Sequence, residues 1–405
     1  MPALQLLIKP ASSLCNLNCS YCFYLDEADQ RETASEGIMS SETLEALVKQ
    51  ACEEAEGELT LAFQGGEPTL AGLPFFEHLI ELEAKYKPDD LVIHHALQTN
   101  GFMLDGKWAR FLKEHNFLVG VSLDGTRGLH DRYRLDKLDE GSFSRVWRNI
   151  ALLQEFEVDF NILTVVTAPL AKRIGAVYRF FKEHNLPWQQ YIPCLSPLKT
   201  AGDTTATEEP EPDWHLSAEA YGDFLCELFD LWFADVTRGQ PIYIRTFENW
   251  VGMLLGQHPE SCGLAGVCSP QHVVEANGDI YPCDFYCLDA YKLGNIRDEG
   301  MSFTSLARSA CSQAFMEESL PLPTACQTCE VRQFCRGGCK RDRFGFDFAE
   351  GPPAAEQLTA LRDGQEVQVS ETGEVLGLNR YCSGYKRFFR YAGPRLNKLA
   401  MSLRR

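Results

Sequence analysis

Sixteen cysteines, distributed unevenly over 405 residues, constrain this chain more than any other feature of its sequence. Three lie between residues 15 and 22, three are scattered over about the next two hundred residues, and ten fall between residues 262 and 382. Cysteines placed at random in a core would not cluster in this way. The sequence shows no secretory signal, so we expect a reducing, cytoplasmic location, where clustered cysteines bind metal or catalyse rather than form disulfides.

The first half of the chain alternates β-prone segments with helical patterns. Strands are expected at residues 3–9, 59–63, 91–97, 117–122, 159–166 and 188–192. Helices are expected near residues 40–55, 74–86, 105–115, 142–156 and 172–184, followed by another at 216–235. Ser40 or Ser41 is expected to cap the first helix. Repeated βα units of this kind predict an α/β fold with a parallel sheet, open or curled, whose ligands bind at the C-terminal ends of the strands.

Charge and hydropathy limit the classes of partner. The formal net charge of −19 argues against binding to nucleic acid or to a membrane surface, because both are anionic. No uncharged run reaches the roughly 18 residues that a membrane span needs. Residues 196–213 are expected to form a linker and residues 345–378 an inserted loop. From residue 262 onward the pattern is rich in loops, so bound metal is expected to supply cross-links that an apolar core would not.

Cys15, Cys19 and Cys22 form a C-x3-C-x2-C motif directly after the first expected strand. Three thiolates can hold three irons of a cubane cluster and leave the fourth iron open, as a catalytic zinc site keeps one position free. A zinc site completed by a distant histidine is the alternative. The second strand ends in a Gly-Gly-Glu-Pro sequence, residues 65–68, which suits close backbone approach, although a tight turn explains it equally well.

Eight further cysteines can bind metal in the C-terminal half. They are Cys262, Cys268, Cys283, Cys326, Cys329, Cys335, Cys339 and Cys382. Eight thiols are the number needed for two fully ligated cubane clusters, but spacing alone favours structural zinc equally. The other five cysteines are expected to be small buried hydrophobic residues: Cys52, Cys194, Cys226, Cys287 and Cys311.

The triad, with Tyr21 before its last cysteine, resembles the signature of the radical S-adenosylmethionine superfamily. The resemblance implies that the methionine group chelates the open iron, that Tyr21 lies against the adenine, and that reduction gives a 5′-deoxyadenosyl radical. It also implies further cofactor contacts. Those expected at the methionine amino group are Gly65, Gly66 and Glu67, those at the ribose and carboxylate are Ser122 and Arg134, and Leu195 is an apolar wall beside the adenine.

The C-terminal cysteines resemble the SPASM extension of radical enzymes that modify peptides. The resemblance implies a partial (β/α)6 TIM-type barrel over residues 1–235 and a loop-rich SPASM domain with a C-terminal helix over residues 236–405. It assigns Cys262, Cys268, Cys283 and Cys339 to a first auxiliary 4Fe–4S cluster. It assigns Cys326, Cys329, Cys335 and Cys382 to a second. With the triad, three 4Fe–4S clusters are expected, and the fully ligated pair would carry electrons or hold structure.

The segment IYPCDFY, residues 280–286, places Asp284 directly after a predicted cluster ligand and among aromatic residues. A carboxylate in apolar surroundings beside an anionic cluster should have a raised pKa, closer to the range that suits a general base. An ordinary turn aspartate is the alternative.

The segments LLIKPASSLCNLNCSYCFY, AFQGGEPTLAG, LQTNG and YPCDFY closely resemble anaerobic sulfatase-maturating enzymes. The resemblance implies oxidation of a cysteine or serine in an unfolded sulfatase to Cα-formylglycine. The radical would abstract hydrogen from Cβ, Asp284 would take the proton, and an auxiliary cluster would accept an electron. An external one-electron reductant such as flavodoxin or ferredoxin is expected.

Two other hypotheses stay open at this point. Because both polar stretches depart from the family pattern, the chain is alternatively a SPASM maturase that forms a thioether, a crosslink or another oxidised side chain in a ribosomally made peptide. A non-catalytic electron carrier or zinc-stabilised binding module is a hypothesis of another class, which an open iron would exclude.

Overall fold

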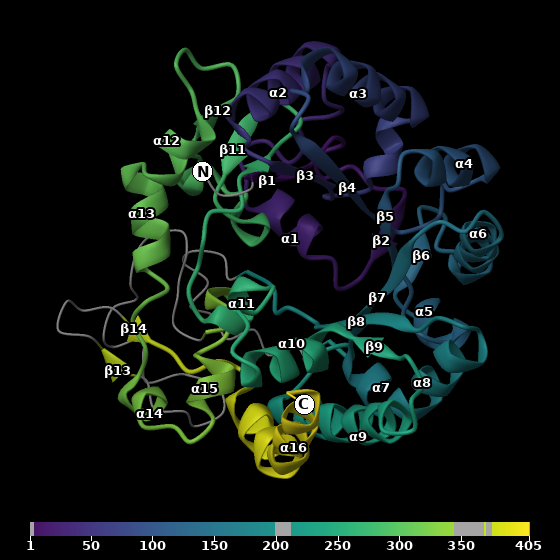
Figure 1. The fold of residues 1–405 in the computed structure, drawn as a ribbon, viewed down its shortest axis with the longest axis vertical. Helices are drawn as coiled ribbons and strands as arrows, with labels where there is room; N and C mark the ends of the chain where they lie inside the picture. The colour runs from purple at the N-terminus through teal and green to yellow at the C-terminus, as the bar shows by residue number, and fades with distance from the viewer. Residues whose placement is uncertain (1–3, 199–211, 344–367, 370–374, 405) are drawn as a thin grey trace. The chain divides into compact units, whose positions relative to one another are not determined.

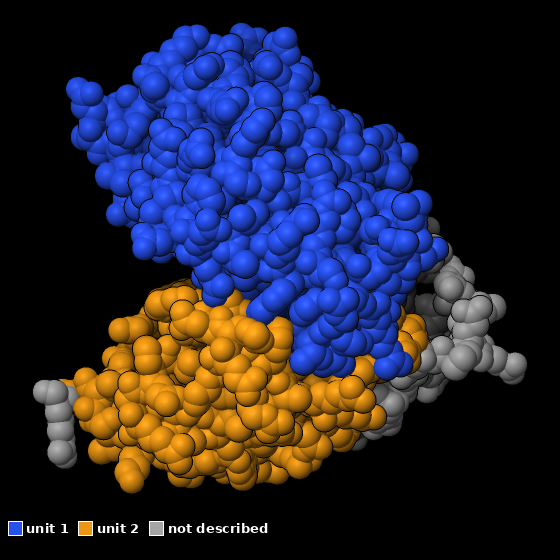
Figure 2. Space-filling view, turned by 90° about the vertical axis from the view of Figure 1, so that its right-hand side faces the viewer, with its two compact units in different colours: residues 1–163, 269–315 blue, residues 164–268, 316–405 orange. Residues whose placement is uncertain are grey.

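The computed structural model of the chain describes residues 4–198, 212–343, 368–369 and 375–404. The chain divides into two compact units, which Figure 2 colours separately. Unit 1 comprises residues 1–163 and 269–315, and unit 2 comprises residues 164–268 and 316–405. The predicted linker and inserted loop lie mostly outside the described residues, and the predicted domain boundary at residue 235 stays a prediction.

Unit 1 is built on a parallel sheet whose strands follow one another in an arc (Figure 1). Its main strands, each paired in parallel with the next, are β1 (Leu4–Ile8), β3 (Glu58–Phe63), β4 (Val92–Thr99), β5 (Leu118–Ser122) and β7 (Phe160–Val166). The sequence boundary between the units falls within β7, after residue 163. In β3 every second side chain is buried, as expected for a strand with one face on the core. Three short strands from much later in the sequence, β10 (Val273–Val274), β11 (Asp279–Tyr281) and β12 (Gly294–Asn295), extend the sheet on the other side of β1.

Helices connect the strands of unit 1. They are α1 (Phe23–Asp29), α2 (Ser41–Glu54), α3 (Leu73–Tyr86), α4 (Gly106–Glu114), α5 (Arg127–His130), α6 (Phe143–Glu155) and α12 (Phe303–Ala307). Helices α2, α3, α4 and α6 lie on the outer side of the strands, and α1 lies on the opposite side (Figure 1). The predicted cap of α2 is confirmed, since Ser40 accepts a hydrogen bond from the Thr43 amide.

Unit 2 combines a parallel strand pair with a helical core. Strand β8 (Trp188–Pro193) pairs with β9 (Tyr243–Ile244). Its helices are α7 (Ala168–Ala171), α8 (Ile174–Glu183), α9 (Ala218–Val236), α10 (Arg245–Leu254), α11 (Cys262–Ala265), α14 (Thr324–Gln327), α15 (Arg332–Cys335) and α16 (Cys382–Leu403). Helix α13 (Ala310–Glu317) spans the sequence boundary between the units. Helix α16 packs closely on α9, because a Cβ on Gly222 would stand 2.8 Å from the Gly384 Cα.

The α/β class with a mostly parallel sheet is confirmed. All six predicted strands and all six predicted helices are present, and their bounds differ from the predicted ones by at most two residues. The sequence did not predict β2 (Leu17–Cys19), β6 (Arg134–Asp136) or the short strands β10 to β12, whose formation depends on partners distant in sequence. Over the described ranges, the helices are too short or too polar to span a membrane.

Candidate active site

The predicted cysteine triad lies in the loop that leaves the C-terminal end of β1. Strand β2 pairs antiparallel with β6, which sets Cys19 opposite Arg134, and helix α1 begins immediately after Cys22. The Cys15 sulfur accepts hydrogen bonds from the Leu17 amide at 3.4 Å and from the Asn100 side chain at 3.6 Å. The loop therefore holds its thiols by backbone pairing and by N–H donors.

The electrostatics of the triad fit a cationic iron–sulfur core. Burial and neighbouring negative charges raise the pKa of the Cys15 thiol to about 11 and that of Cys19 to about 12. Glu67 is the larger of these charges at Cys15, and Cys22 acts on both thiols. The positive charge of Arg134 opposes this effect at Cys19. Three buried thiols whose charges disfavour one another's ionisation are stable as thiolates when a bound metal core neutralises them.

The Gly-Gly-Glu-Pro turn follows β3 and touches the triad loop. The Gly66 amide donates to the Ser12 carbonyl at 2.8 Å, and the Glu67 amide donates to the Leu14 carbonyl at 2.7 Å. A Cβ on Gly66 would lie 2.1 Å from the Leu14 oxygen, and Gly65 has a φ of 113°. Only glycine fits this approach, so the turn fixes the backbone that leads into Cys15.

The Glu67 side chain is fully buried and directed into the protein. Its Oε1 accepts from the Thr69 amide and from the hydroxyls of Thr69 and Thr99, and its Oε2 accepts from the Asn100 amide. Burial raises the pKa of Glu67, whereas these hydrogen bonds lower it. The Glu67 carboxylate, which was expected at the methionine amino group, thus joins the turn to the end of β4.

Tyr21 and Arg134 converge on Asp124, which follows the end of β5. Arg134 Nε donates to Asp124 Oδ2 at 2.8 Å, its Nη2 donates to Oδ1 at 3.3 Å, and the Tyr21 hydroxyl donates to Oδ2. Burial raises the pKa of Asp124, but the charge and hydrogen bonds of Arg134, with smaller effects of His130 and Tyr21, together lower it below its usual value. Ser122, at the end of β5, accepts from Gln98 at 3.3 Å. Three predicted site residues, Tyr21, Arg134 and Ser122, therefore lie near the C-terminal end of β5, together with Asp124, which the sequence did not suggest.

Asp284 follows β11 in a short 3-10 helix, η2 (Asp284–Tyr286), and is buried in unit 1. Its Oδ2 accepts from the Tyr24 hydroxyl and from the Gln64 amide, each at 2.7 Å. Its Oδ1 is buried and has no hydrogen-bond donor among the described residues. Burial raises the pKa of Asp284, and this predicted direction is confirmed, although Lys9, Tyr24 and Gln64 oppose it.

A buried charge network supports this carboxylate. Lys9 forms an ion pair with Glu275 at 3.5 Å, and its ammonium lies 5.2 Å from the centre of the Tyr24 ring. Burial lowers the pKa of Lys9, but the negative groups around it outweigh burial and raise it. Arg31 also pairs with Glu275. The two cations, Lys9 and Arg31, therefore share this one buried glutamate.

The first predicted auxiliary set is partly assembled within unit 2. Burial raises the pKa values of Cys262 and Cys339, and the negative charge of Cys268 raises both. A Cβ on Gly263 would lie 3.7 Å from the Cys339 Cβ, which places the loop of α11 against Cys339. The fourth predicted member, Cys283, belongs to unit 1 and is buried.

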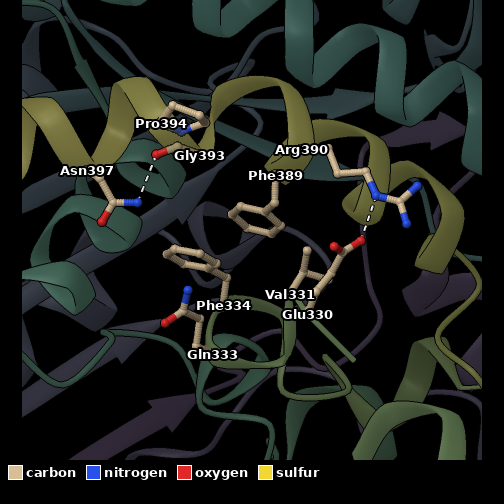
Figure 3. A pocket seen from close by; sticks show the side chains of 9 residues that line it. All are labelled: Glu330, Val331, Gln333, Phe334, Phe389, Arg390, Gly393, Pro394 and Asn397. Atoms are coloured by element: carbon tan, nitrogen blue, oxygen red, sulfur yellow. Dashed lines mark hydrogen bonds and ion pairs between the residues drawn. The ribbon is translucent and has the colours of Figure 1, made fainter. Parts of the chain in front are cut away.

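The second predicted set lies entirely in unit 2. Burial and the negative charges of Cys382, Cys326 and Cys329 raise the pKa of Cys335 to about 11. Figure 3 shows a groove of about 320 Å³ whose lining residues include neighbours in sequence of Cys329 and Cys335. It is lined by Glu330, Val331, Gln333, Phe334, Phe389, Arg390, Gly393, Pro394 and Asn397.

Two contacts across this groove join the Cys329–Cys335 loop to the helix that begins at Cys382. The rings of Phe334 and Phe389 stack at 4.5 Å, and Arg390 pairs with Glu330 at 2.6 Å (Figure 3). The two segments that carry these cysteines are thus cross-linked by side chains.

The cysteines of the structure are not joined to one another. None of the sixteen, all of which lie in the described ranges, forms a disulfide. Cys52, Cys194 and Cys287 are buried, whereas Cys226 and Cys311 are half-buried. Over residues 4–198, 212–343, 368–369 and 375–404, no three cysteine, histidine or acidic side chains are grouped closely enough to hold one metal ion.

Sequence reasoning missed several residues of this site. Tyr24, Gln64 and Lys9 lie inside segments that carried the family resemblance. Nothing in their spacing indicated that Tyr24 and Gln64 bind Asp284 or that Lys9 lies over the Tyr24 ring. Asp124 had no motif at all. Leu195, the predicted apolar wall, is half-buried just after β8 in unit 2.

Comparison with known proteins identifies one family model in the N-terminal part of the chain and another in the cysteine-rich C-terminal part. Residues 10–170 match the Radical SAM superfamily, and residues 266–330 match the SPASM iron–sulfur cluster-binding domain. A cysteine-type anaerobic sulfatase-maturating enzyme of Clostridium perfringens (strain 13 / Type A) is 41% identical over 404 residues, which is 100% of both chains. A serine-type anaerobic sulfatase-maturating enzyme of Bacteroides thetaiotaomicron is 30% identical over 410 residues, covering 99% of this chain and 92% of that protein.

Solved structures are similar to the chain as well. Native anSMEcpe with bound AdoMet and Cp18Cys peptide superposes with a TM-score of 0.86 at 41% identity, covering 99% of this chain and 100% of that one. Streptococcus suis SuiB bound to its precursor peptide SuiA superposes with a TM-score of 0.57 at 16% identity, covering 84% and 72%. The second likeness shows a shared fold alone.

Proposed function

Because the chain belongs to the anaerobic sulfatase-maturating enzymes, which are radical S-adenosylmethionine enzymes with a SPASM domain, we propose that it oxidises a cysteine of a sulfatase peptide to Cα-formylglycine. The cysteine-type relative is 41% identical to the chain and the serine-type relative is 30% identical, which favours cysteine as the substrate residue. The chain uses S-adenosylmethionine and three 4Fe–4S clusters.

One observation carries the proposal, namely the buried and unpartnered Oδ1 of Asp284. A buried carboxylate oxygen without a donor costs free energy unless a ligand supplies the missing hydrogen bond. A thiol or hydroxyl of a bound peptide is such a donor. With Oδ2 held by Tyr24 and Gln64, Oδ1 is the atom that accepts the substrate proton, so Asp284 acts as the general base.

Each predicted ligand keeps its role in the proposal. Cys15, Cys19 and Cys22 hold the cluster that binds S-adenosylmethionine, and the two auxiliary sets are those assigned from the sequence, Cys283 included. When bound, this cluster and cofactor would supply the radical chemistry that removes a hydrogen atom from the substrate Cβ, and the auxiliary clusters would accept the remaining electron. Water would then hydrolyse the peptide thioaldehyde to the aldehyde with release of hydrogen sulfide.

The protein around the cofactor orients and screens it. Asp124 holds Arg134 and the Tyr21 hydroxyl in place, so the Tyr21 ring is fixed beside the triad for contact with adenine. The backbone of Gly65, Gly66 and Glu67 faces the methionine amino group. Ser122 contacts the ribose region, and Leu195 contributes an apolar wall.

A cytoplasmic flavodoxin or ferredoxin supplies the reducing electron in this proposal. None of the sixteen described cysteines forms a disulfide, which suits a reducing compartment.

The test uses anaerobically reconstituted full-length protein and a sulfatase-motif peptide in a cysteine and a serine form. We expect 5′-deoxyadenosine together with a peptide whose CH2–SH group has become CHO. Deoxyadenosine formation with a crosslinked or thioether product from this peptide would overturn the sulfatase assignment.

Asp284→Asn tests the proposed base. The variant should keep its iron and bind S-adenosylmethionine, but lose peptide oxidation by about 100-fold, at the low end of the effect of a positioned base. Asp289→Asn is the matched control, because Asp289 is exposed and lies five residues further along the same segment. Equal rates for the two variants would remove Asp284 from this role.

A further inference from the structure

A buried arginine in unit 2 binds the loops that carry the auxiliary cysteines of that unit and takes no part in the mechanism described above. Arg343 is 4% exposed, although a guanidinium is charged at every physiological pH. It follows Cys339 by four residues. Charged side chains are almost never fully buried without a partner of opposite charge.

The hydrogen bonds of Arg343 all reach backbone carbonyls close to the cysteines. Nη2 donates to Gly266 and to Gly338, each at 3.0 Å, Nε donates to Gly337 at 3.2 Å, and Nη1 donates to Ser319 at 2.6 Å. Gly266 lies between Cys262 and Cys268 in the sequence, and Gly337 and Gly338 lie between Cys335 and Cys339. One fork thus connects the loops that carry both sets.

The loop of Gly337 and Gly338 leaves room for the Arg343 guanidinium. Gly337 and Gly338 have φ values of 88° and 69°, which ordinary side chains rarely adopt, and a Cβ on Gly337 would lie 3.1 Å from Arg343 Nη2. The Ser319 hydroxyl, whose own carbonyl binds the guanidinium, accepts a hydrogen bond from the Cys268 amide at 2.9 Å. The arginine and its acceptors therefore position the ligand loops directly.

Cysteines from both auxiliary sets act on the charge of Arg343. Burial lowers the pKa of its guanidinium overall, and the negative charges of Cys268, Cys339, Cys326 and Cys335, two from each auxiliary set, act in the opposite direction. A fully cysteine-ligated cluster is anionic and gains negative charge on reduction, and net charge is one of the factors that set its potential. A fixed cation near two such clusters favours the reduced state of both.

We propose that Arg343 is a positioning residue that joins the ligand loops of both auxiliary clusters and raises the reduction potential of each. Its role is to make both clusters better acceptors of the electron that leaves the substrate. The inference rests on the ligand assignment in the proposed function.

Lys386 and Arg332 provide controls, because each is a cation that is expected to influence fewer of the auxiliary cysteines than Arg343 does. Lys386 acts on Cys326 and Cys382, so its charge is expected to influence the second cluster only. Arg332 is exposed, is located on α15, and donates to the Gln327 carbonyl. Its charge is expected to be screened by solvent.

The experiment measures iron content and the midpoint potentials of the auxiliary clusters by EPR-monitored redox titration. The background is full-length protein with Cys15, Cys19 and Cys22 replaced by alanine, which should hold about eight irons if the ligand assignment is right. Fewer irons in this background would refute the ligand assignment. The effect of Arg343 on the potentials of the clusters that remain would still be tested by comparing its variants.

In this background Arg343→Gln should shift both potentials to more negative values by at least about 59 mV, a tenfold change for a one-electron couple. Lys386→Gln should shift only the second, and Arg332→Gln neither. Arg343→Lys keeps the charge but loses the fork, so its potentials should stay closer to the parent than those of Arg343→Gln.

Equal shifts in the lysine and glutamine variants would overturn the proposed effect of charge, as would unchanged potentials in Arg343→Gln with all iron bound. If Arg343→Gln takes up no iron, the result for Arg343→Lys tests the proposal instead. Iron uptake by Arg343→Lys with potentials close to those of the parent supports the proposal. Loss of iron in Arg343→Lys as well would overturn the effect on the potentials and leave Arg343 only its hydrogen bonds to the loops.

Discussion

Replacing Gly66 by alanine should remove the N-terminal cluster while leaving the auxiliary clusters in place. The new Cβ would stand 2.1 Å from the Leu14 oxygen and 2.7 Å from the backbone carbons of Leu14 and Ser13. These atoms belong to the main chain that leads into Cys15, so no side-chain rotation relieves the overlap. Restoring ordinary contact requires a shift of about 1 Å, since non-bonded carbon atoms prefer about 3.5 Å or more.

Two hydrogen bonds set the cost of that shift. The Gly66 amide to Ser12 and the Glu67 amide to Leu14 hold the turn against the loop at 2.8 and 2.7 Å. Each is worth about 1 kcal/mol, and overpacking adds about 1–3 kcal/mol, so the free energy of unfolding should fall by about 3–5 kcal/mol. The displaced Cys15 would then no longer meet its cluster in register with Cys19 and Cys22.

The assay combines iron counting with denaturant unfolding of the apo protein. Gly66→Ala should hold about eight irons where the parent holds about twelve, and should form no 5′-deoxyadenosine. Gly106→Ala is the control, because a Cβ there meets nothing within 4 Å and the residue begins helix α4. Full iron content and unchanged unfolding of Gly66→Ala would refute this reading of the close approach.

Three further predictions follow from buried groups. Tyr24→Phe removes one donor to Asp284 and should slow peptide oxidation about tenfold, as mass spectrometry of the peptide will measure, with iron content unchanged; an unaltered rate would contradict the role of this contact. Asp124→Asn leaves the Arg134 guanidinium buried and uncompensated, so the free energy of unfolding should fall by about 3–5 kcal/mol in urea titrations, and a change below 1 kcal/mol would count against it. Burial lowers the pKa of His130 to about 3 in the folded protein, so as the pH falls the unfolded chain binds a proton there first. The free energy of unfolding of the apo protein should therefore fall as the pH drops from about 6.5 toward 3, by up to about 1.4 kcal/mol per pH unit. His130→Gln should flatten that slope.

The physical basis of the His130 prediction is its hydrogen-bond chain. The Asp124 amide donates to Nδ1 at 3.2 Å, and Nε2 lies 2.9 Å from the Ser142 hydroxyl, which itself donates to the Arg134 carbonyl at 2.7 Å. The network thus assigns a neutral ring with its proton on Nε2. A second proton on Nδ1 would face the Asp124 N–H group, so the folded protein resists protonation.

The sequence alone determined what depends on short spacing. Cys15, Cys19 and Cys22 are within eight residues, so covalent geometry already brings their thiols to one place, and the Cys329–Cys335 loop follows the same rule. The alternation of β3 and the amphipathic helices likewise fixed the α/β class, because periodicity is a local property.

Tertiary structure alone decided the partners of the buried charges. Tyr24 and Asp284 are 260 residues apart, and Arg343 and Gly266 are 77 apart, so no local pattern links them. Their meeting depends on how strands and loops pack. In a low-dielectric interior each buried charge must find its hydrogen bonds there, and only the folded chain determines which groups provide them.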